Sequence, residues 1–216
     1  DVYTNSTNIR PQIYVWDPKL GGVANDGSLG GRGAYVTINA STGVSSNTDS
    51  DANNYFMPKQ ALFVAPNGSG AVDVEFQESF KDITQDQTTI FSVTEETASL
   101  DIKLYDQNSY SANATSKDAI HIEFSENFSN EIDINDAYKF ENVDENLAIL
   151  NNGNLLSMEE RNLPVNGEIL PLFVNQHRTE DYVFTIDLEG FDSETNAYLK
   201  DQYTNEQYLL TAGEQS

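Results

Sequence analysis

Apolar and polar residues alternate along much of the chain with the two-residue period of a β-strand. In the segment 71–76, Val72, Val74 and Phe76 alternate with two acidic residues. The same period recurs in three further segments, 99–104, 119–124 and 182–188. A strand with this pattern buries one face and exposes the other to water, as strands of antiparallel sheets do.

Shorter runs rich in β-branched and aromatic residues predict three more strands, at 12–16, 34–38 and 61–65. Turn-forming residues follow several runs, as in the Pro-Asn-Gly-Ser-Gly segment 66–70. Helical signals are weak, since 133–140 and 157–162 each have room for one turn only. We therefore expect an all-β fold, with one antiparallel, jelly-roll-like β-sandwich domain over residues 1–216.

The charge balance narrows the classes of partner. The chain has 35 acidic and 11 basic residues, a formal net charge of −24 and no cysteine. Such a field repels phosphate backbones and anionic membranes, so we expect neither nucleic-acid binding nor membrane insertion. Because cysteine is absent, disulfides and thiolate sites are excluded. Stability must come from a packed core, to which 11 tyrosines and 11 phenylalanines contribute.

Two polar loops are candidate ligand-binding segments, because binding residues concentrate on loops held by a rigid scaffold. The first is glycine-rich and spans 21–33; the second spans 41–54 and is almost wholly Ser, Thr, Asn, Asp and Gly. Near them we expect a sugar-stacking platform formed by Trp16, Tyr14 and Tyr35 with Asp26. Tyr105 and Tyr110 are further aromatic candidates. The alternative is that most of these rings belong to the core.

Two acidic clusters are candidate calcium sites, and calcium is the one cofactor that the sequence suggests. Asp49, Asp51 and Asn53 have the first spacings of a calcium loop, although Asn54 and Gln60 stand where that loop needs Gly and Glu. The second cluster is Asp133, Asn135 and Asp136. The alternatives are a solvated turn for the first cluster and Asx-turn hydrogen bonding for the second.

Catalytic signals are sparse, and we do not expect an enzyme. The sequence contains no Gly-x-Ser-x-Gly motif, and the two histidines, His121 and His177, are too far apart for a paired zinc motif. Glu75 and Glu123 lie on polar faces of predicted strands, where a glycosidase would place its two carboxylates. Outward-facing glutamates are nevertheless the default in an acidic sandwich.

A set of segments in a fixed order resembles a known class of exported protein. The segment 55–64, Tyr-Phe-Met-Pro-Lys-Gln-Ala-Leu-Phe-Val, resembles one common in surface proteins that Bacteroidetes export through the type IX secretion system. Segments 13–18 and 33–39 are similar to the strand pair that precedes it. Segment 133–139 resembles an Asp-rich turn that follows, and 197–210 resembles a hairpin near the end of such passenger modules.

The resemblance implies a secreted or cell-surface protein. In such proteins a further strand and a C-terminal sorting domain usually follow, so we expect the chain to be a fragment of a longer surface protein. The function expected first is that of a non-catalytic, adhesin-like module that binds a glycan or a protein through loops at one end of the sandwich. The alternatives are a passenger or spacer domain that contacts outer-membrane components of the secretion machinery, and a glycan-active enzyme or its accessory domain.

Overall fold

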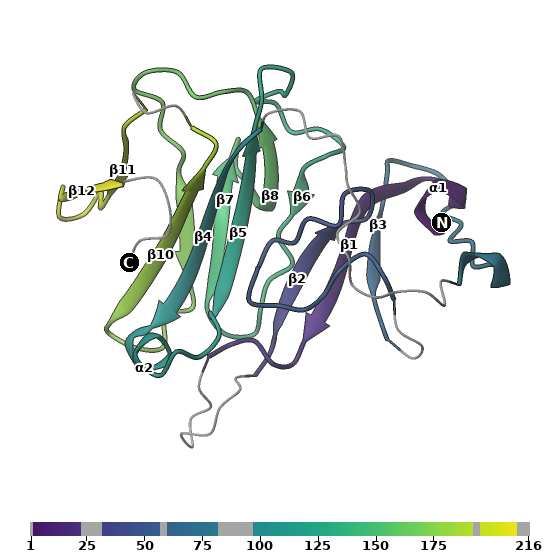
Figure 1. Ribbon diagram of the computed structural model, residues 1–216, viewed down its shortest axis with the longest axis horizontal. Helices are drawn as coiled ribbons and strands as arrows, with labels where there is room; N and C mark the ends of the chain where they lie inside the picture. The colour runs from purple at the N-terminus through teal and green to yellow at the C-terminus, as the bar shows by residue number, and fades with distance from the viewer. Residues whose placement is uncertain (1, 23–31, 57–59, 82–96, 192–194, 211–216) are drawn as a thin grey trace.

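The computed structural model describes residues 2–22, 32–56, 60–81, 97–191 and 195–210, and it is built almost entirely of strands (Figure 1). Three short helices interrupt them: α1 (Val2–Asn5), η1 (Glu78–Phe80) and α2 (Gln107–Ser111). The strands are β1 (Ile9–Asp17), β2 (Ala34–Asn39), β3 (Phe63–Pro66), β4 (Ala98–Asp106), β5 (Asp118–Phe124), β6 (Ala137–Tyr138), β7 (Asn146–Asn151), β8 (Asn154–Arg161), β9 (Leu172–Asn175), β10 (Tyr182–Glu189), β11 (Ala197–Lys200) and β12 (Gln207–Leu210).

The largest sheet has the strand order β10-β4-β5-β8-β7-β9, with β6 paired to β8, and it curls into a half-barrel (Figure 1). Its neighbouring strands are antiparallel except for the parallel pair β5–β8. Alternate apolar residues point to the inside of the curl. They form one buried cluster of Ala98, Ile102, Leu104, Ile120, Ile122, Phe124, Leu147, Ile149, Leu156 and Ile186.

A smaller sheet, β2-β1-β3, lies beside β6 and the half-barrel (Figure 1). One face carries a second apolar cluster of Ile13, Val15, Leu20, Ala34, Val36 and Ile38. Phe56 and Leu62, from the segments that follow, pack against this cluster. The hairpin β11–β12 forms a separate two-stranded sheet whose Leu199 and Leu210 pack against the core of the half-barrel.

Polar contacts join the small sheet to the half-barrel. Thr37 Oγ1 and Ser157 Oγ are 2.7 Å apart, and both residues are buried. Gln12 Nε2 donates to the carbonyl oxygens of Ile134 and Asn135 at 3.0 and 2.7 Å. Hydrogen bonds are directional, and a buried polar group without a partner is costly. These bonds therefore fix the position of one sheet against the other.

The predicted all-β class with antiparallel sheets is confirmed, as are the strands expected around 12–16, 34–38, 99–104, 119–124 and 182–188. The strand predicted at 71–76 is not formed. Its alternation is typical of a strand, but only Asp73 forms a bridge, with Thr7, and Phe76 is 65% exposed. A strand needs a partner along its length, and hydrophobic alternation does not supply one.

The two segments with weak helical signals form no helix. Segment 157–162 lies mostly in β8, and segment 133–140 contains bends and the short strand β6. The sequence does contain a hairpin signal beside β8, an Asn-Gly pair. Asn152 and Gly153 connect β7 to β8 with φ angles of 47° and 81°. Asn-Gly is the preferred pair for a two-residue turn that requires positive φ at both positions.

The ion pair of Asp118 and Lys139 is enclosed by the half-barrel. Lys139 Nζ lies 2.6 Å from Asp118 Oδ1, and each side chain is only 2% exposed. Asp118 also accepts hydrogen bonds from the backbone N–H groups of Ala119 and Leu147. One carboxylate therefore links the start of β5 to the segment after β6 and to β7.

We predict that Lys139→Met lowers the free energy of unfolding by about 3–5 kcal/mol, because the substitution leaves Asp118 buried without its cation. Lys19→Met is the matched control: Lys19 and its partner Asp51 are exposed, and such pairs contribute about 0–1 kcal/mol. Urea denaturation of both variants measures the difference. Equal, small losses in the two variants would contradict the structural role of the buried pair.

Candidate binding site on the polar face of the half-barrel

One face of the half-barrel is polar because alternate residues of β4, β5 and β10 point away from the core. Asp101 of β4 is the direct cross-strand partner of both Asp187 in β10 and His121 in β5. Two residues further along β4, Lys103 is the partner of Thr185. Residues from three strands therefore bring carboxylate, imidazole, ammonium and hydroxyl groups onto one surface.

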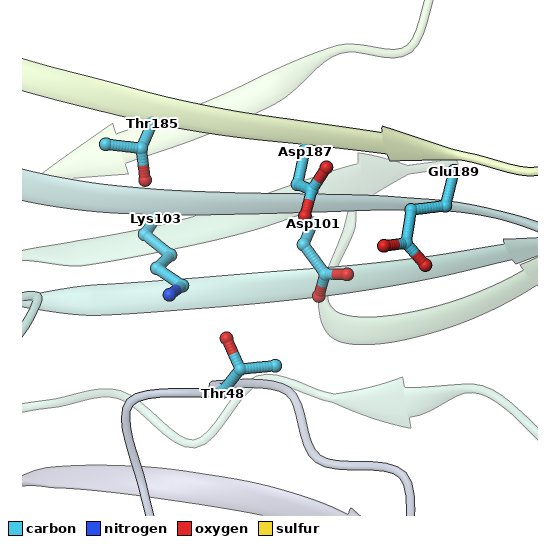
Figure 2. A pocket seen from close by; sticks show the side chains of 6 residues that line it. All are labelled: Thr48, Asp101, Lys103, Thr185, Asp187 and Glu189. Carbon is cyan, nitrogen blue, oxygen red and sulfur yellow. The ribbon is translucent and has the colours of Figure 1, made fainter. Parts of the chain in front are cut away.

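A cavity of about 270 Å³ opens on this polar face. In Figure 2 the side chains from β4 and β10 lie opposite Thr48, which comes from the loop after β2. We name it the carboxylate cavity; its lining residues are Thr48, Asp101, Lys103, Thr185, Asp187 and Glu189. Such a lining suits hydroxyl or cationic groups and not an apolar ligand.

Asp49 holds the loop over the cavity. Its carboxylate accepts hydrogen bonds from Lys103 Nζ at 2.7 Å, the Tyr105 hydroxyl at 3.0 Å and the Ser116 backbone N–H at 2.8 Å. Burial alone would raise the pKa of Asp49, but these donors outweigh it and hold the pKa below its ordinary value. Asp49 is therefore an ionised anchor that joins the loop to β4 and to the approach to β5.

The Asp101–His121 pair forms the inner end of the site. His121 Nδ1 lies 3.0 Å from Asp101 Oδ1, and His121 is only 8% exposed. Burial lowers the pKa of His121, but the carboxylates of Asp101 and Glu123 outweigh it and raise the pKa from 6.5 to about 9. At neutral pH the ring is therefore a cation, and both of its nitrogens carry a proton.

The second nitrogen of this ring has an ion-pair partner but no hydrogen-bond partner. His121 Nε2 is shielded from solvent and makes no hydrogen bond within the described part of the chain; Glu123 Oε1 lies 3.9 Å away. His121 lines a second, smaller cavity of about 10 Å³, which has room for one water-sized group. We name it the histidine cavity; Glu123, Glu160, Asn39 and Thr42 also line it.

Crowded carboxylates surround the histidine cavity. Burial, together with the charges of Glu123, Asp133 and Asp136, raises the pKa of Glu160 from 4.5 to about 7, although a hydrogen bond from Asn135 opposes the shift. Burial likewise raises the pKa of Asp136 from 3.8 to about 6. The hydrogen bonds that its carboxylate accepts from the backbone N–H groups of Asp133 and Glu160 lower the pKa but do not outweigh burial. This side of the site therefore carries excess negative charge.

The carboxylate cavity also has an excess of negative charge, at Asp187. Its Oδ1 atom is shielded from solvent and has no hydrogen-bond partner among the residues that the structure describes. Its strand partner, Asp101, is also acidic, and like charges directly opposite each other destabilise a strand pair. The cavity thus contains a buried acceptor atom that lacks a donor.

The aromatic candidates lie on the face of the small sheet turned away from its apolar cluster. Tyr14 is fully buried against Phe140, with ring centroids 4.2 Å apart, and burial raises its pKa to about 12. Trp16 meets Tyr35 edge to face at 4.9 Å. A Cβ added at Gly33 would lie 2.5 Å from the Trp16 ring, so the backbone of Gly33 passes directly against it.

These contacts support the core alternative for Tyr14, whereas Trp16 and Tyr35 are partly exposed. Tyr105 and Tyr110 pack against each other, with ring centroids 5.8 Å apart. Asp26 and most of the glycine-rich loop lie outside the described residues. The platform of four residues therefore stays a prediction, and for Tyr14 the structure shows packing.

The calcium candidates engage protein groups. In the first cluster, Asp49 is the loop anchor, Asp51 pairs with Lys19 at 3.2 Å, and Asn53 Oδ1 accepts from the Tyr55 N–H. In the second, the Asn135 N–H donates to Asp133 Oδ1 and the Asp133 N–H donates to Asp136 Oδ2.

The contact of Asn135 with Asp133 is that of an Asx-turn, whereas Asp136 accepts from the backbone N–H three residues before it. Within the described ranges, no three His, Asp or Glu side chains gather as a metal site requires. Calcium binding stays a prediction from the sequence.

The two glutamates considered for glycoside hydrolysis lie on different parts of the fold. Glu123 is in β5 of the half-barrel, whereas Glu75 lies beside the bridge between Thr7 and Asp73, and its N–H donates to Ser6 Oγ. A glycosidase pair must flank one bond of one substrate. No contact recorded in the described structure joins these two carboxylates.

Sequence reasoning did not select Asp101, Lys103, Thr185, Asp187 or Glu189. Each lies on the polar side of a strand whose alternation was recognised, so its direction was predictable. Which strands are neighbours, and in what register, was not readable from the alternation, and the cavity depends on that register.

Comparison with protein-family models, with curated proteins and with solved structures finds no match. No helix in the described part of the chain has the length and apolar character needed to cross a membrane.

We predict that Glu160→Gln stabilises the protein near pH 8 and has little effect near pH 4. Because folding raises the pKa of Glu160 from 4.5 to about 7, the ionised carboxylate costs stability increasingly over that interval and at a constant level above it. Thermal melting of the variant and of the exposed control Glu126→Gln measures the difference. We expect a gain of about 2–4 °C at pH 8 for Glu160→Gln only; a gain of equal size at both pH values would contradict the shift.

His121, unlike Glu160, stabilises the folded protein when it is charged. Folding raises its pKa from 6.5 to about 9, so the stabilisation is complete below pH 6.5 and is lost as the pH rises through 9. The stability lost in His121→Gln should therefore shrink between pH 6 and pH 10. Denaturation curves at both pH values test this, and His177→Gln, on the chain's other histidine, is the control. A loss that stays constant with pH would show that His121 is not a buried cation.

Proposed function

We propose that the protein is a non-catalytic, adhesin-like module of a secreted or cell-surface protein, and that it binds a glycan in the carboxylate cavity. The observation that carries the proposal is the cavity itself. Its three carboxylates, one ammonium and two hydroxyls lie on a rigid sheet, beneath a loop anchored by Asp49. Sugar hydroxyls both donate and accept hydrogen bonds, so a mixed lining of this kind suits them.

The non-catalytic part of the proposal is supported by the sequence, which contains no Gly-x-Ser-x-Gly motif and no closely spaced pair of histidines. The proposed location outside the cell is supported by the acidic composition and by the resemblance to type IX exported proteins.

We predict that a glycan array finds ligands for the wild-type protein and that Asp187→Asn weakens their binding about tenfold, because the substitution changes an acceptor in the cavity. Asp181→Asn makes the same chemical change at an exposed residue just before β10, outside the cavity lining, and should bind as the wild type does. Titration calorimetry on the best array ligand gives the dissociation constants. The proposal fails if no glycan binds, or if the two variants bind alike.

A further inference from the structure

The ion pair of Asp118 and Lys139 is the most enclosed lysine–aspartate pair in the described structure. Each of its side chains is 2% exposed. The partners in the other such pairs are at least 10% exposed: Lys117–Asp106, Lys103–Asp49 and Lys19–Asp51. Two buried charges have given up their hydration, and their mutual attraction repays that cost only in part. A neutral product of the same two groups would remove the cost.

Burial acts more strongly on the carboxyl group of Asp118 than its partners do. Burial raises the pKa of Asp118, and the cation of Lys139 with two backbone N–H groups opposes the shift without cancelling it. At Asp49 and Asp106 the partners outweigh burial, so the pKa of each carboxyl group lies below its ordinary value. Of these three aspartates, Asp118 therefore takes a proton from its lysine most readily. That transfer leaves a neutral amine beside a neutral carboxyl group.

The carboxyl group of Asp118 is held in an arrangement that suits acyl transfer. The Leu147 N–H donates to its Oδ2 atom at 2.6 Å, and the Ala119 N–H donates to Oδ1 at 2.9 Å. Lys139 Nζ lies 2.6 Å from the same Oδ1 atom. Attack of an amine on Cγ would place negative charge on Oδ2, where the Leu147 N–H stabilises it. Because the fold already holds amine and carboxyl group together, the reaction is intramolecular.

We propose that Lys139 and Asp118 condense to form an intramolecular isopeptide bond. One proton passes from Nζ to Oδ1, the neutral amine attacks Cγ, and the Nζ–Cγ bond forms as the Cγ–Oδ1 bond breaks. A second proton follows from Nζ to Oδ1, which leaves as water, so nothing is oxidised or reduced. The amide keeps Oδ2 as its carbonyl oxygen, next to the Leu147 N–H. Bulk water is excluded from the site, which disfavours hydrolysis of the product.

The bond would give the chain a covalent cross-link that disulfides cannot supply, because the sequence contains no cysteine. β5 and β6 each pair with β8, and the isopeptide bond would join the start of β5 directly to the residue after β6. The two bonded residues are 21 positions apart in the sequence. A cross-link that closes such a loop stabilises a fold mainly by restricting the unfolded chain.

Mass spectrometry of the denatured wild-type protein tests the proposal. We expect an intact mass lower than that of the sequence by one water molecule. Trypsin should cut the denatured chain after Lys19, whose ion pair with Asp51 is exposed, but not after Lys139, whose amine has become an amide. Tandem mass spectra of the joined peptides should place the bond between Asp118 and Lys139. A wild-type protein of full mass, cut at both lysines, would overturn the proposal.

Substitutions separate the covalent bond from the ion pair. Lys139→Arg keeps a cation beside Asp118, but a guanidinium stays protonated and does not condense, so this variant should have the full mass of its sequence. The control Lys19→Met should lose one water molecule as the wild type does. A water loss that persists in Lys139→Arg would also refute the bond, because the dehydration would then lie elsewhere, as in a succinimide at another aspartate. The wild-type spectra do not depend on whether a variant folds.

Discussion

The carboxylate of Asp49 is the contact on which the site depends. It lies in a loop that belongs by sequence to the small sheet, yet all three of its donors come from the half-barrel: Lys103, Tyr105 and the backbone of Ser116. The neighbouring Asn47 adds a hydrogen bond to Ser116 Oγ at 2.9 Å. A loop made of small polar residues has no apolar face to bury, so specific hydrogen bonds must hold it in place. Without this anchor Thr48 would not face β4 and β10, and the carboxylate cavity would have no wall on that side.

The same sheet uses charge in two different ways on its two faces. On the inside, Asp118 and Lys139 are sealed together, and the backbone N–H groups of β5 and β7 satisfy the rest of the carboxylate. On the outside, carboxylates outnumber their cations, and burial of Glu160 among other acids raises its pKa to about 7. Burial of the enclosed pair outweighs the partners of Asp118 and raises its pKa, whereas on the outer face Asp187 Oδ1 has no hydrogen-bond donor in the described structure. An acidic surface keeps a protein soluble, whereas a buried acceptor without a donor needs a water molecule or a ligand to satisfy it.

The aromatic residues show how context decides between packing and binding. Tyr14 and Phe140 are in contact where the small sheet meets the segment after β6, and Trp16 lies against Gly33 and Tyr35. A ring that packs on one side of a thin sheet has less area for a ligand. The polar groups of the half-barrel lie on the side of their sheet opposite the apolar core, and one of them, Asp187 Oδ1, has no hydrogen-bond partner among the described residues. For this reason the candidate site is placed on β4, β5 and β10, and not at the aromatic residues that the sequence suggested.

The sequence by itself determined the fold class and the directions of many side chains. The alternation in 99–104, 119–124 and 182–188 predicted three strands and placed Asp101, His121 and Asp187 on their polar sides, because successive residues of a strand point to opposite faces. It could not show that segment 71–76 lacks a partner strand, or that segment 157–162 is drawn into β8 by β5 and β7, since pairing depends on residues far away in the chain. The tertiary structure alone decided the register that aligns Asp187, Asp101 and His121 in one row, and the docking of Asp49 beside them. Both depend on long-range contacts, which local hydrophobic patterns do not encode.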